Sequence, residues 1–433
     1  MEQNGLTELS NALPDDEDLP VIHVEICQHP TSVANTDSVA RFGAKVVSQL
    51  QGRYVMDEVT VTEFEDPQIQ EHVSMVTISY VESKSAADHL LKYSETRFAF
   101  HVYQLHEDTP VSEEIEEEEQ ITAARHWLLP SVEFQGLWES LVFDSDVKEK
   151  LLQYARTTLL FSDKEVNSNI VSWNRVILLH GPPGTGKTSL CKALAQKLCI
   201  RFSDRYLYGE LVEINSHSLF SKWFSESGKL VQKMFSKIHK LIDDPDSLVC
   251  VLIDEVESLT AARKSAISGS EPSDAIRVVN AVLTQIDQIK KCSNVIILTT
   301  SNITEAIDLA FVDRADVKQY IGLPSMAAVY KIYHSCINEL VRAGIISPAQ
   351  QILELRALEV MRFIENDATL LSLKLRDIAS KSVGFSGRSL RKMPFLAHTF
   401  YQQAGAITME TFLTLLDKAV VKQKMEEKQL ATQ

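Results

Sequence analysis

The sequence lacks the features that mark membrane and secreted proteins. It contains no run of about 18 or more apolar residues, so no transmembrane helix is expected. Its first stretch, MEQNGLTELSNALPDDEDLP, has neither a basic region nor an apolar segment, so we expect no signal peptide. The six cysteines are scattered and form no CxxC pair. We therefore expect ordinary reduced thiols of an intracellular protein rather than a disulfide framework or a zinc site.

Positively charged residues are also fewer than negatively charged ones. The 433 residues include 43 Lys and Arg against 59 Asp and Glu, which gives a formal net charge of −16. This balance argues against nucleic acid or an anionic membrane as a partner across the whole surface, although it is compatible with a local basic patch. Hydrophobic residues make up 45% of the chain, which is enough for a packed core, and the length suits about two or three domains.

Changes of composition along the chain predict five segments. Residues 1–20 are polar and are expected to form a flexible tail. Residues 21–105 combine β-rich stretches such as VSMVTISYV with SVARFGAKVVSQLQ, whose apolar residues have helical spacing, and predict a small α+β domain. The glutamate block SEEIEEEEQ indicates an acidic linker over 106–129. Short continuous apolar runs predict a parallel α/β domain over 130–324, and the pattern over 325–433 is helical.

The stretch HGPPGTGKTS carries the clearest chemical signal. It follows the apolar run RVILL and precedes SLCKALAQKL, and it fits the pattern G-x-x-x-x-G-K-[ST] in a strand–loop–helix context. Glycines let backbone N–H groups turn toward phosphates, the lysine brings a positive charge to the β/γ-phosphates, and the threonine hydroxyl suits Mg²⁺. The residues expected to bind ATP here are Gly181, Pro182, Pro183, Gly184, Thr185, Gly186, Lys187 and Thr188.

Two further apolar runs end in polar residues that complete such a site. SLVCVLIDE (247–255) brings Asp254 to the edge of the predicted sheet where ligands bind, so Asp254 is expected to share Mg²⁺ with Thr188. Glu255 is placed to orient and activate the attacking water. NVIILTTSN (294–302) ends in Asn302, which either reaches the water or the γ-phosphate or simply forms a turn.

The order of these motifs, with RVVNAVLTQID (277–287) among them, resembles the AAA+ ATPase superfamily. Segments such as EINSHSLFSKWFSESGKLV and ILTTSNITEAIDLAFVDRADVKQYIG extend the resemblance to the AAA+ family that remodels HORMA-domain proteins. The likeness covers nearly the whole chain and is strongest from about 167 to 324. It implies an α/β AAA+ module, a parallel αβα nucleotide-binding domain with a helical lid, preceded by a small α+β domain.

The same resemblance assigns roles to residues that spacing alone leaves open. It implies a homohexameric ring with ATP sites between subunits. In that frame Asn302 is the sensor-1 residue, and Arg314, in FVDRADVKQ, is the arginine finger that reaches a neighbour's γ-phosphate. Many relatives carry two arginines in this stretch and this chain carries one. Arg388, in GFSGRSLRK, matches a sensor-2 position in the lid. The Gly/Ser-rich stretch around it would, on its own, also suit the start of a helix, with Arg388 as a capping or solvated residue.

An aromatic pair in a polar stretch, SLFSKWFSESGKL, resembles the substrate-gripping pore loop of AAA rings. Lys222, Trp223 and Phe224 would contact an extended peptide, because aromatic faces offer stacking and apolar contact without sequence preference. The alternative is that Trp223 belongs to the core, since tryptophan is highly buried on average. A second loop, TAARKSAISGSEPSDAIR (260–277), would either face the pore too or be a plain mobile loop.

The resemblance thus implies an ATPase that converts HORMA-domain proteins from a closed to an open form, often with a HORMA-like adaptor. The expected setting is nucleus and cytoplasm, with possible chromosome or kinetochore association, in spindle-checkpoint signalling, meiotic recombination and chromosome synapsis. Two other functions share parts of the motif set. A DNA-acting motor or clamp loader conflicts with the acidic charge and the aromatic loop. A non-hydrolysing assembly scaffold would have no use for Glu255 and Arg314.

Overall fold

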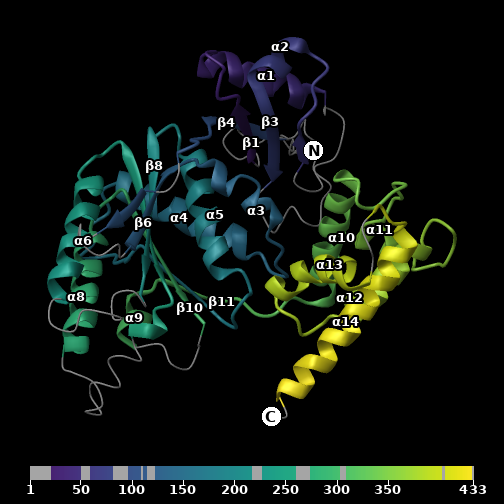
Figure 1. The fold of residues 1–433 in the computed structure, drawn as a ribbon. Helices are drawn as coiled ribbons and strands as arrows, with labels where there is room; N and C mark the ends of the chain where they lie inside the picture. The colour runs from purple at the N-terminus through teal and green to yellow at the C-terminus, as the bar shows by residue number, and fades with distance from the viewer. Residues whose placement is uncertain are drawn as a thin grey trace, which may run out of the picture.

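A computed structural model describes residues 21–49, 59–80, 96–108, 111–114, 122–216, 227–259, 274–302, 309–401 and 405–431. Figure 1 shows a small N-terminal domain above a large α/β domain, with a helical domain beside it. No helix in the described ranges is long and apolar enough to cross a membrane. All six cysteines are free thiols, as expected, and four of them are buried.

The N-terminal domain is a four-stranded sheet covered on one face by two helices. Its elements are β1 (Val21–Gln28), α1 (Thr36–Ser48), β2 (Val59–Val61), α2 (Pro67–His72), β3 (Val73–Tyr80) and β4 (Arg97–Gln104). The strand order is β2-β3-β1-β4. Ile22, Val24 and Ile26 alternate along β1 and pack into the core under α1 and α2. The intervening Glu25 lies on the other face and contacts the large domain. The predicted α+β fold of this segment is confirmed.

The large domain is built on one seven-stranded sheet with the order β11-β7-β10-β9-β8-β6-β5. Strands β7 to β11 of this sheet run parallel, while β6 pairs antiparallel with β8. Its elements are β5 (Val111–Glu114), β6 (Thr122–Leu129), η3 (Val132–Phe134), α3 (Leu137–Ser140), α4 (Val147–Asp163), β7 (Val176–His180), α5 (Lys187–Arg201), β8 (Tyr208–Asn215), α6 (Ser227–Ile242), β9 (Ser247–Asp254), α8 (Asp274–Ile289), β10 (Val295–Ser301), α9 (Leu309–Arg314) and β11 (Val317–Tyr320).

The continuous apolar runs of the sequence follow from burial on both faces of this sheet. Along β9, Val249 and Val251 pack with α6 and α8 in one core cluster, whereas Cys250 and Leu252 pack with α4 and α5 in the other. Figure 1 shows the two helical layers on opposite sides of the sheet. The predicted strands 174–181, 247–255 and 294–302 are confirmed as β7, β9 and β10. Their carboxyl ends meet at one edge, which is where parallel α/β sheets bind ligands.

The acidic linker predicted over 106–129 is wrong for part of its length. β5 and β6 lie within this range and form the outer strands of the large sheet. Trp127 and Leu129 of β6 are buried beneath α5, and His126 pairs with Glu210 on β8. The glutamate block hid this strand, because the pairing that buries β6 comes from β8, far along the chain.

The C-terminal helical domain has a core of its own. It consists of α10 (Met326–Arg342), α11 (Leu355–Val360), α12 (Leu370–Lys381), α13 (Gly387–Tyr401) and α14 (Met409–Ala431). Tyr330 and Tyr333 of α10 are almost fully buried in this core, where α10 packs against α12 and α13. The predicted helical lid is confirmed. The first turn of α13 faces the glycine loop of the large domain, so the two domains together enclose the site described next.

Candidate active site

The phosphate loop runs from the carboxyl end of β7 to the first residue of α5. Gly181 has a φ of +143°, and a Cβ on it would lie 2.2 Å from the carbonyl oxygen of Ile321. Gly184 has a φ of +75°, and a Cβ there would meet Ser386 Oγ of the lid at 2.8 Å. Any other residue at either position would be strained and would collide with its neighbours. The glycines predicted from the motif are therefore required by the backbone.

Lys187 is buried at the mouth of this loop, and no carboxylate in the described part of the chain forms an ion pair with it. Its Nζ donates to the backbone oxygens of Gly181 at 2.9 Å and Pro182 at 2.8 Å. Thr185 Oγ1 also donates to the Pro182 oxygen, at 3.0 Å. Burial lowers the pKa of Lys187, and the nearby carboxylates oppose that shift without forming an ion pair with it. A buried ammonium that bonds only to carbonyls can transfer those bonds to phosphate oxygens.

Thr188 and Asp254 lie together as the motif predicted. Thr188 Oγ1 donates to Asp254 Oδ1 at 2.8 Å, and Thr300 Oγ1 donates to the same oxygen. A hydroxyl and a carboxylate side by side fit Mg²⁺, which takes one or two protein oxygens and completes its shell with water and phosphate. Bound there, the metal would neutralise charge on the β- and γ-phosphates.

Glu255 is exposed at the sheet edge in a left-handed backbone conformation, with a φ of +57°. Such a conformation costs about 1–3 kcal/mol for a residue other than glycine and is common at functional sites. Its N–H donates to Thr300 Oγ1 at 3.2 Å, and its Oε1 accepts from Asn302 Nδ2 at 3.2 Å. The structure thus brings the predicted base and sensor together. An exposed carboxylate held by one amide can orient a water for attack on the γ-phosphate.

Arg388 reaches the site from the lid. Its backbone N–H donates to the oxygen of Gly184 at 3.0 Å, and a Cβ on Gly184 would lie 3.2 Å from its own Cβ. Its guanidinium is close enough to lower the pKa of Lys187. A positive side chain on the first turn of α13 therefore stands beside the phosphate loop.

Arg314 lies elsewhere. It is the last residue of α9, and its guanidinium forms a two-point ion pair with Asp287 of α8, with nitrogen–oxygen distances of 2.7 and 3.1 Å. Asp287 also pairs with Lys290, which donates to Asn174 just before β7. Arg314 is therefore near the amino end of β7, whereas the phosphate loop follows the carboxyl end. The structure does not bring Arg314 to this chain's own phosphate site.

The predicted gripping residues, Lys222, Trp223 and Phe224, lie outside the described residues, as does most of the second loop predicted over 260–277. Both predictions stand untested.

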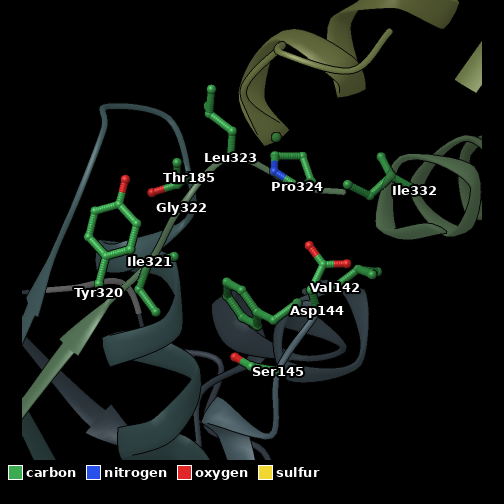
Figure 2. A pocket seen from close by; sticks show the side chains of 12 residues that line it. Val142, Asp144, Ser145, Thr185, Tyr320, Ile321, Gly322, Leu323, Pro324 and Ile332 are labelled. Atoms are coloured by element: carbon green, nitrogen blue, oxygen red, sulfur yellow. The ribbon is translucent and has the colours of Figure 1, made fainter. Parts of the chain in front are cut away.

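Sequence reasoning missed a pocket beside the phosphate loop. Figure 2 shows Ile321 and Ile332 on two sides of a hollow whose floor includes Val142 and Asp144. Thr185 of the phosphate loop and Gly387 of the lid also line it. Asp144 accepts hydrogen bonds from the N–H and hydroxyl of Ser325, and so ties the large domain to the lid at this point. The lining comes from separate segments with no common motif, so no short sequence signal could have found it. A mostly apolar pocket here suits the base of a nucleotide.

Comparisons with known proteins agree with this geometry. Three protein families match successive segments: the TRIP13 N-terminal domain over 17–108, the ATPase family associated with various cellular activities (AAA) over 177–323, and the TRIP13-like AAA+ ATPase lid C-terminal domain over 325–424.

Full-length relatives extend the match. The chain is 60% identical over 425 residues to the human pachytene checkpoint protein 2 homolog, covering 98% of each. It is similar to the structure of C. elegans PCH-2, with a TM-score of 0.75, 36% identity and coverage of 94% of this chain and 100% of that one. Its fold is also similar to that of a chain in the structure of the E. coli MS115-1 HORMA:CdnC:Trip13 complex. The TM-score is 0.51 and the identity 17%, and the match covers 68% of this chain and 94% of that chain. The chain is therefore an AAA+ ATPase of the pachytene checkpoint protein 2 (TRIP13) family.

Proposed function

We propose that this chain forms a homohexameric, ATP-driven remodeller that converts HORMA-domain proteins from a closed, partner-bound form to an open one. The observation that carries the proposal is the Glu255–Asn302 contact beside an intact phosphate loop, in a chain of this family. A scaffold that never turned over ATP would need no such pair. The E. coli Trip13 relative is found in a complex with a HORMA protein, which supports the substrate class.

Arg314 would act on the neighbouring subunit in such a ring. Its position near the amino end of β7 keeps it from its own phosphate loop, and about a quarter of its side chain is exposed. An arginine that is fixed by Asp287 and partly accessible suits contact with the γ-phosphate bound by the next subunit. Arg388 would sense the same nucleotide from the lid of the subunit that binds it.

The substrate would meet two parts of the chain. The N-terminal domain, about 21–105, would dock the HORMA client and a HORMA-like adaptor. Lys222, Trp223 and Phe224 would then grip the client's N-terminal tail in the central pore. An aromatic pair in an acidic protein suits a peptide better than DNA or RNA, which require a positive surface. We expect no direct nucleic-acid or membrane partner.

The family points to a setting as well. We propose roles in spindle-checkpoint silencing and activation, in meiotic recombination and in chromosome synapsis, with the protein present in nucleus and cytoplasm and associated with chromosomes or kinetochores.

The test is conversion of a closed HORMA protein to its open form, measured with purified adaptor, ATP and Mg²⁺. Wild type is compared with Trp223→Ala, and the ATPase rate of each is measured in parallel. Wild type should convert the client, and Trp223→Ala should hydrolyse ATP without converting it.

Equal conversion by both proteins would show that Trp223 is not the grip. Hydrolysis without conversion by wild type would contradict the HORMA assignment, and stimulation of that hydrolysis by DNA would favour a DNA-acting motor instead.

A further inference from the structure

The turn after β9 is bound to the end of β10 by one residue, Thr300. Its hydroxyl donates to Asp254 and accepts the N–H of Glu255 at 3.2 Å. Its carbonyl accepts the N–H of Val256 at 3.0 Å. These bonds hold the backbone of Glu255 in its left-handed conformation, but none of them touches the Glu255 side chain. Among the described residues, the one hydrogen bond to that carboxylate comes from Asn302.

Asn302 itself is held by a second glutamate. Glu257 Oε1 accepts the backbone N–H of Asn302 at 3.0 Å. Asn302 directly follows the last residue of β10, so strand pairing does not fix it. The contact from Glu257 is therefore placed to hold the Asn302 backbone, and with it the direction in which its amide meets Glu255. A displacement of about 1 Å at such a position can reduce a rate about 100-fold.

Glu257 also lies within the electrostatic field of the phosphate site. Among the carboxylates around Lys187, it has the largest effect in raising the pKa of that lysine, ahead of Asp254 and Glu255. Its second oxygen is buried and has no hydrogen-bond partner among the described residues. A carboxylate placed only to cap a turn would more commonly face solvent, because burying an unpartnered oxygen is unfavourable.

We propose that Glu257 is a positioning residue for ATP hydrolysis, which fixes the Asn302 backbone so that the Asn302 amide orients Glu255. This rests on the proposed roles of Glu255 and Asn302. Glu257 touches neither nucleotide nor water in this scheme. It acts through a single hydrogen bond that an uncharged acceptor could also make.

The experiment compares steady-state ATPase kinetics of the full-length wild type, Glu257→Gln, Glu257→Leu, Asn302→Ala and the double variant Glu257→Leu/Asn302→Ala. Glutamine keeps a carbonyl acceptor for the Asn302 N–H and removes the charge, whereas leucine removes both. We expect Glu257→Gln to keep kcat within about three-fold of wild type. We expect Glu257→Leu to lower kcat by about 10- to 100-fold, with KM for ATP nearly unchanged. The double variant should be no slower than the slower single variant, because both act through one contact.

Three results would overturn the proposal. A Glu257→Gln variant as slow as Glu257→Leu would assign the effect to charge. A double variant that loses the product of the two single effects would make the residues independent. Loss of fluorescent ATP-analogue binding or of the cooperative thermal transition in Glu257→Leu, with Glu257→Gln also slow, would make the role structural. A wild type that binds but does not hydrolyse ATP would instead contradict the proposed function.

Discussion

The two ends of α5 bury lysines in opposite ways. At its amino end, Lys187 is 4% exposed, and its hydrogen bonds to described residues go to backbone carbonyls. Toward its carboxyl end, Lys197 is 2% exposed and pairs with Glu25 of the N-terminal domain at 2.7 Å and with Glu139 at 3.1 Å. Burying a charge is unfavourable unless something compensates it. The charge of Lys197 is compensated by carboxylates of the protein, as in a structural ion pair. The charge of Lys187 is left for a bound anion to compensate, as expected of a residue that binds phosphate.

The Lys197 cluster also joins two domains. Glu25 forms a second ion pair, with Arg201 at 3.0 Å, and Arg201 donates a hydrogen bond to Ser79 of β3 at 2.8 Å. Burial alone would raise the pKa of Glu25, but the charges of Lys197 and Arg201 outweigh burial and bring it down to about 2. The N-terminal domain is therefore held on the helix whose other end directly follows the phosphate loop.

Replacing Lys187 with alanine should have the largest effect. ATPase activity should fall by about 1,000-fold or more, because the cation aimed at the β/γ-phosphates is lost. Folding should not suffer, since the variant removes a buried charge that has no ion-pair partner among the described residues. The measurements are binding of a fluorescent ATP analogue and thermal melting. A variant that binds ATP normally, or that melts well below wild type, would contradict the distinction between the two lysines.

Replacing Lys197 with methionine should produce the reverse pattern. The free energy of unfolding should fall by about 3 kcal/mol, because Glu25 keeps a buried charge with one partner fewer. ATP affinity should change little. Denaturant unfolding measures the loss, and Glu25→Gln/Lys197→Met is the control that should recover part of it. A large loss of ATP affinity in a folded Lys197→Met protein would place this end of α5 in the nucleotide site after all.

A third way to bury a basic group is to keep it neutral. His23 and His101 bond to each other at 2.9 Å next to Glu25 and Arg201. Burial, helped by Arg201, lowers the pKa of His23 to about 3, and burial, helped by His23, lowers that of His101 to about 4. Unfolded histidine titrates near 6.5, so the unfolded chain gains protons first as pH falls.

The stability contributed by this pair should thus be complete above about pH 6.5 and decline below it. The loss should reach about 2 kcal/mol by pH 5 if one ring is forced to stay neutral. Chemical denaturation at pH 7 and pH 5 measures it, with His23→Asn/His101→Asn as the control that should flatten the dependence. An equal decline in the control would assign the effect to other groups.

The partly exposed pair of Arg314 and Asp287 should matter least for stability. Asp287→Asn should change the free energy of unfolding by less than about 1 kcal/mol, because solvent screens the pair. If Arg314 acts on a neighbouring subunit, the same variant should still alter the ATPase rate. Denaturant unfolding and ATPase assays at a concentration that favours assembly would check both. A loss comparable to that of Lys197→Met would mean that the pair is structural.

The sequence predicted the site residues best where they lie close together along the chain. The phosphate loop, Asp254 and Glu255 could be found because a short motif and a buried strand place them directly. Other features depend on distant segments. The pairing of β6 with β8, the contact of Glu25 with Lys197, and the pocket between Ile321 and Ile332 each need the folded chain. No sequence pattern marks Glu257 for a related reason, because its proposed role depends on the backbone of Asn302, which follows a different strand.

Arg314 is a further residue whose surroundings the sequence could not predict. The resemblance identified the residue, and the structure adds its partner Asp287 and its place near the amino end of β7. The proposed role in a neighbouring site rests on the absence of Arg314 from this chain's own phosphate site, and no spacing in the sequence carries that information.

The most direct test of the account is single-turnover ATP hydrolysis by Glu255→Gln compared with wild type. The account predicts that the variant binds ATP with nearly the same Kd and cleaves it at least about 100-fold more slowly, because an amide cannot accept a proton from the attacking water. Cleavage at the wild-type rate would contradict it, and would mean that the group that activates water at this sheet edge is not Glu255.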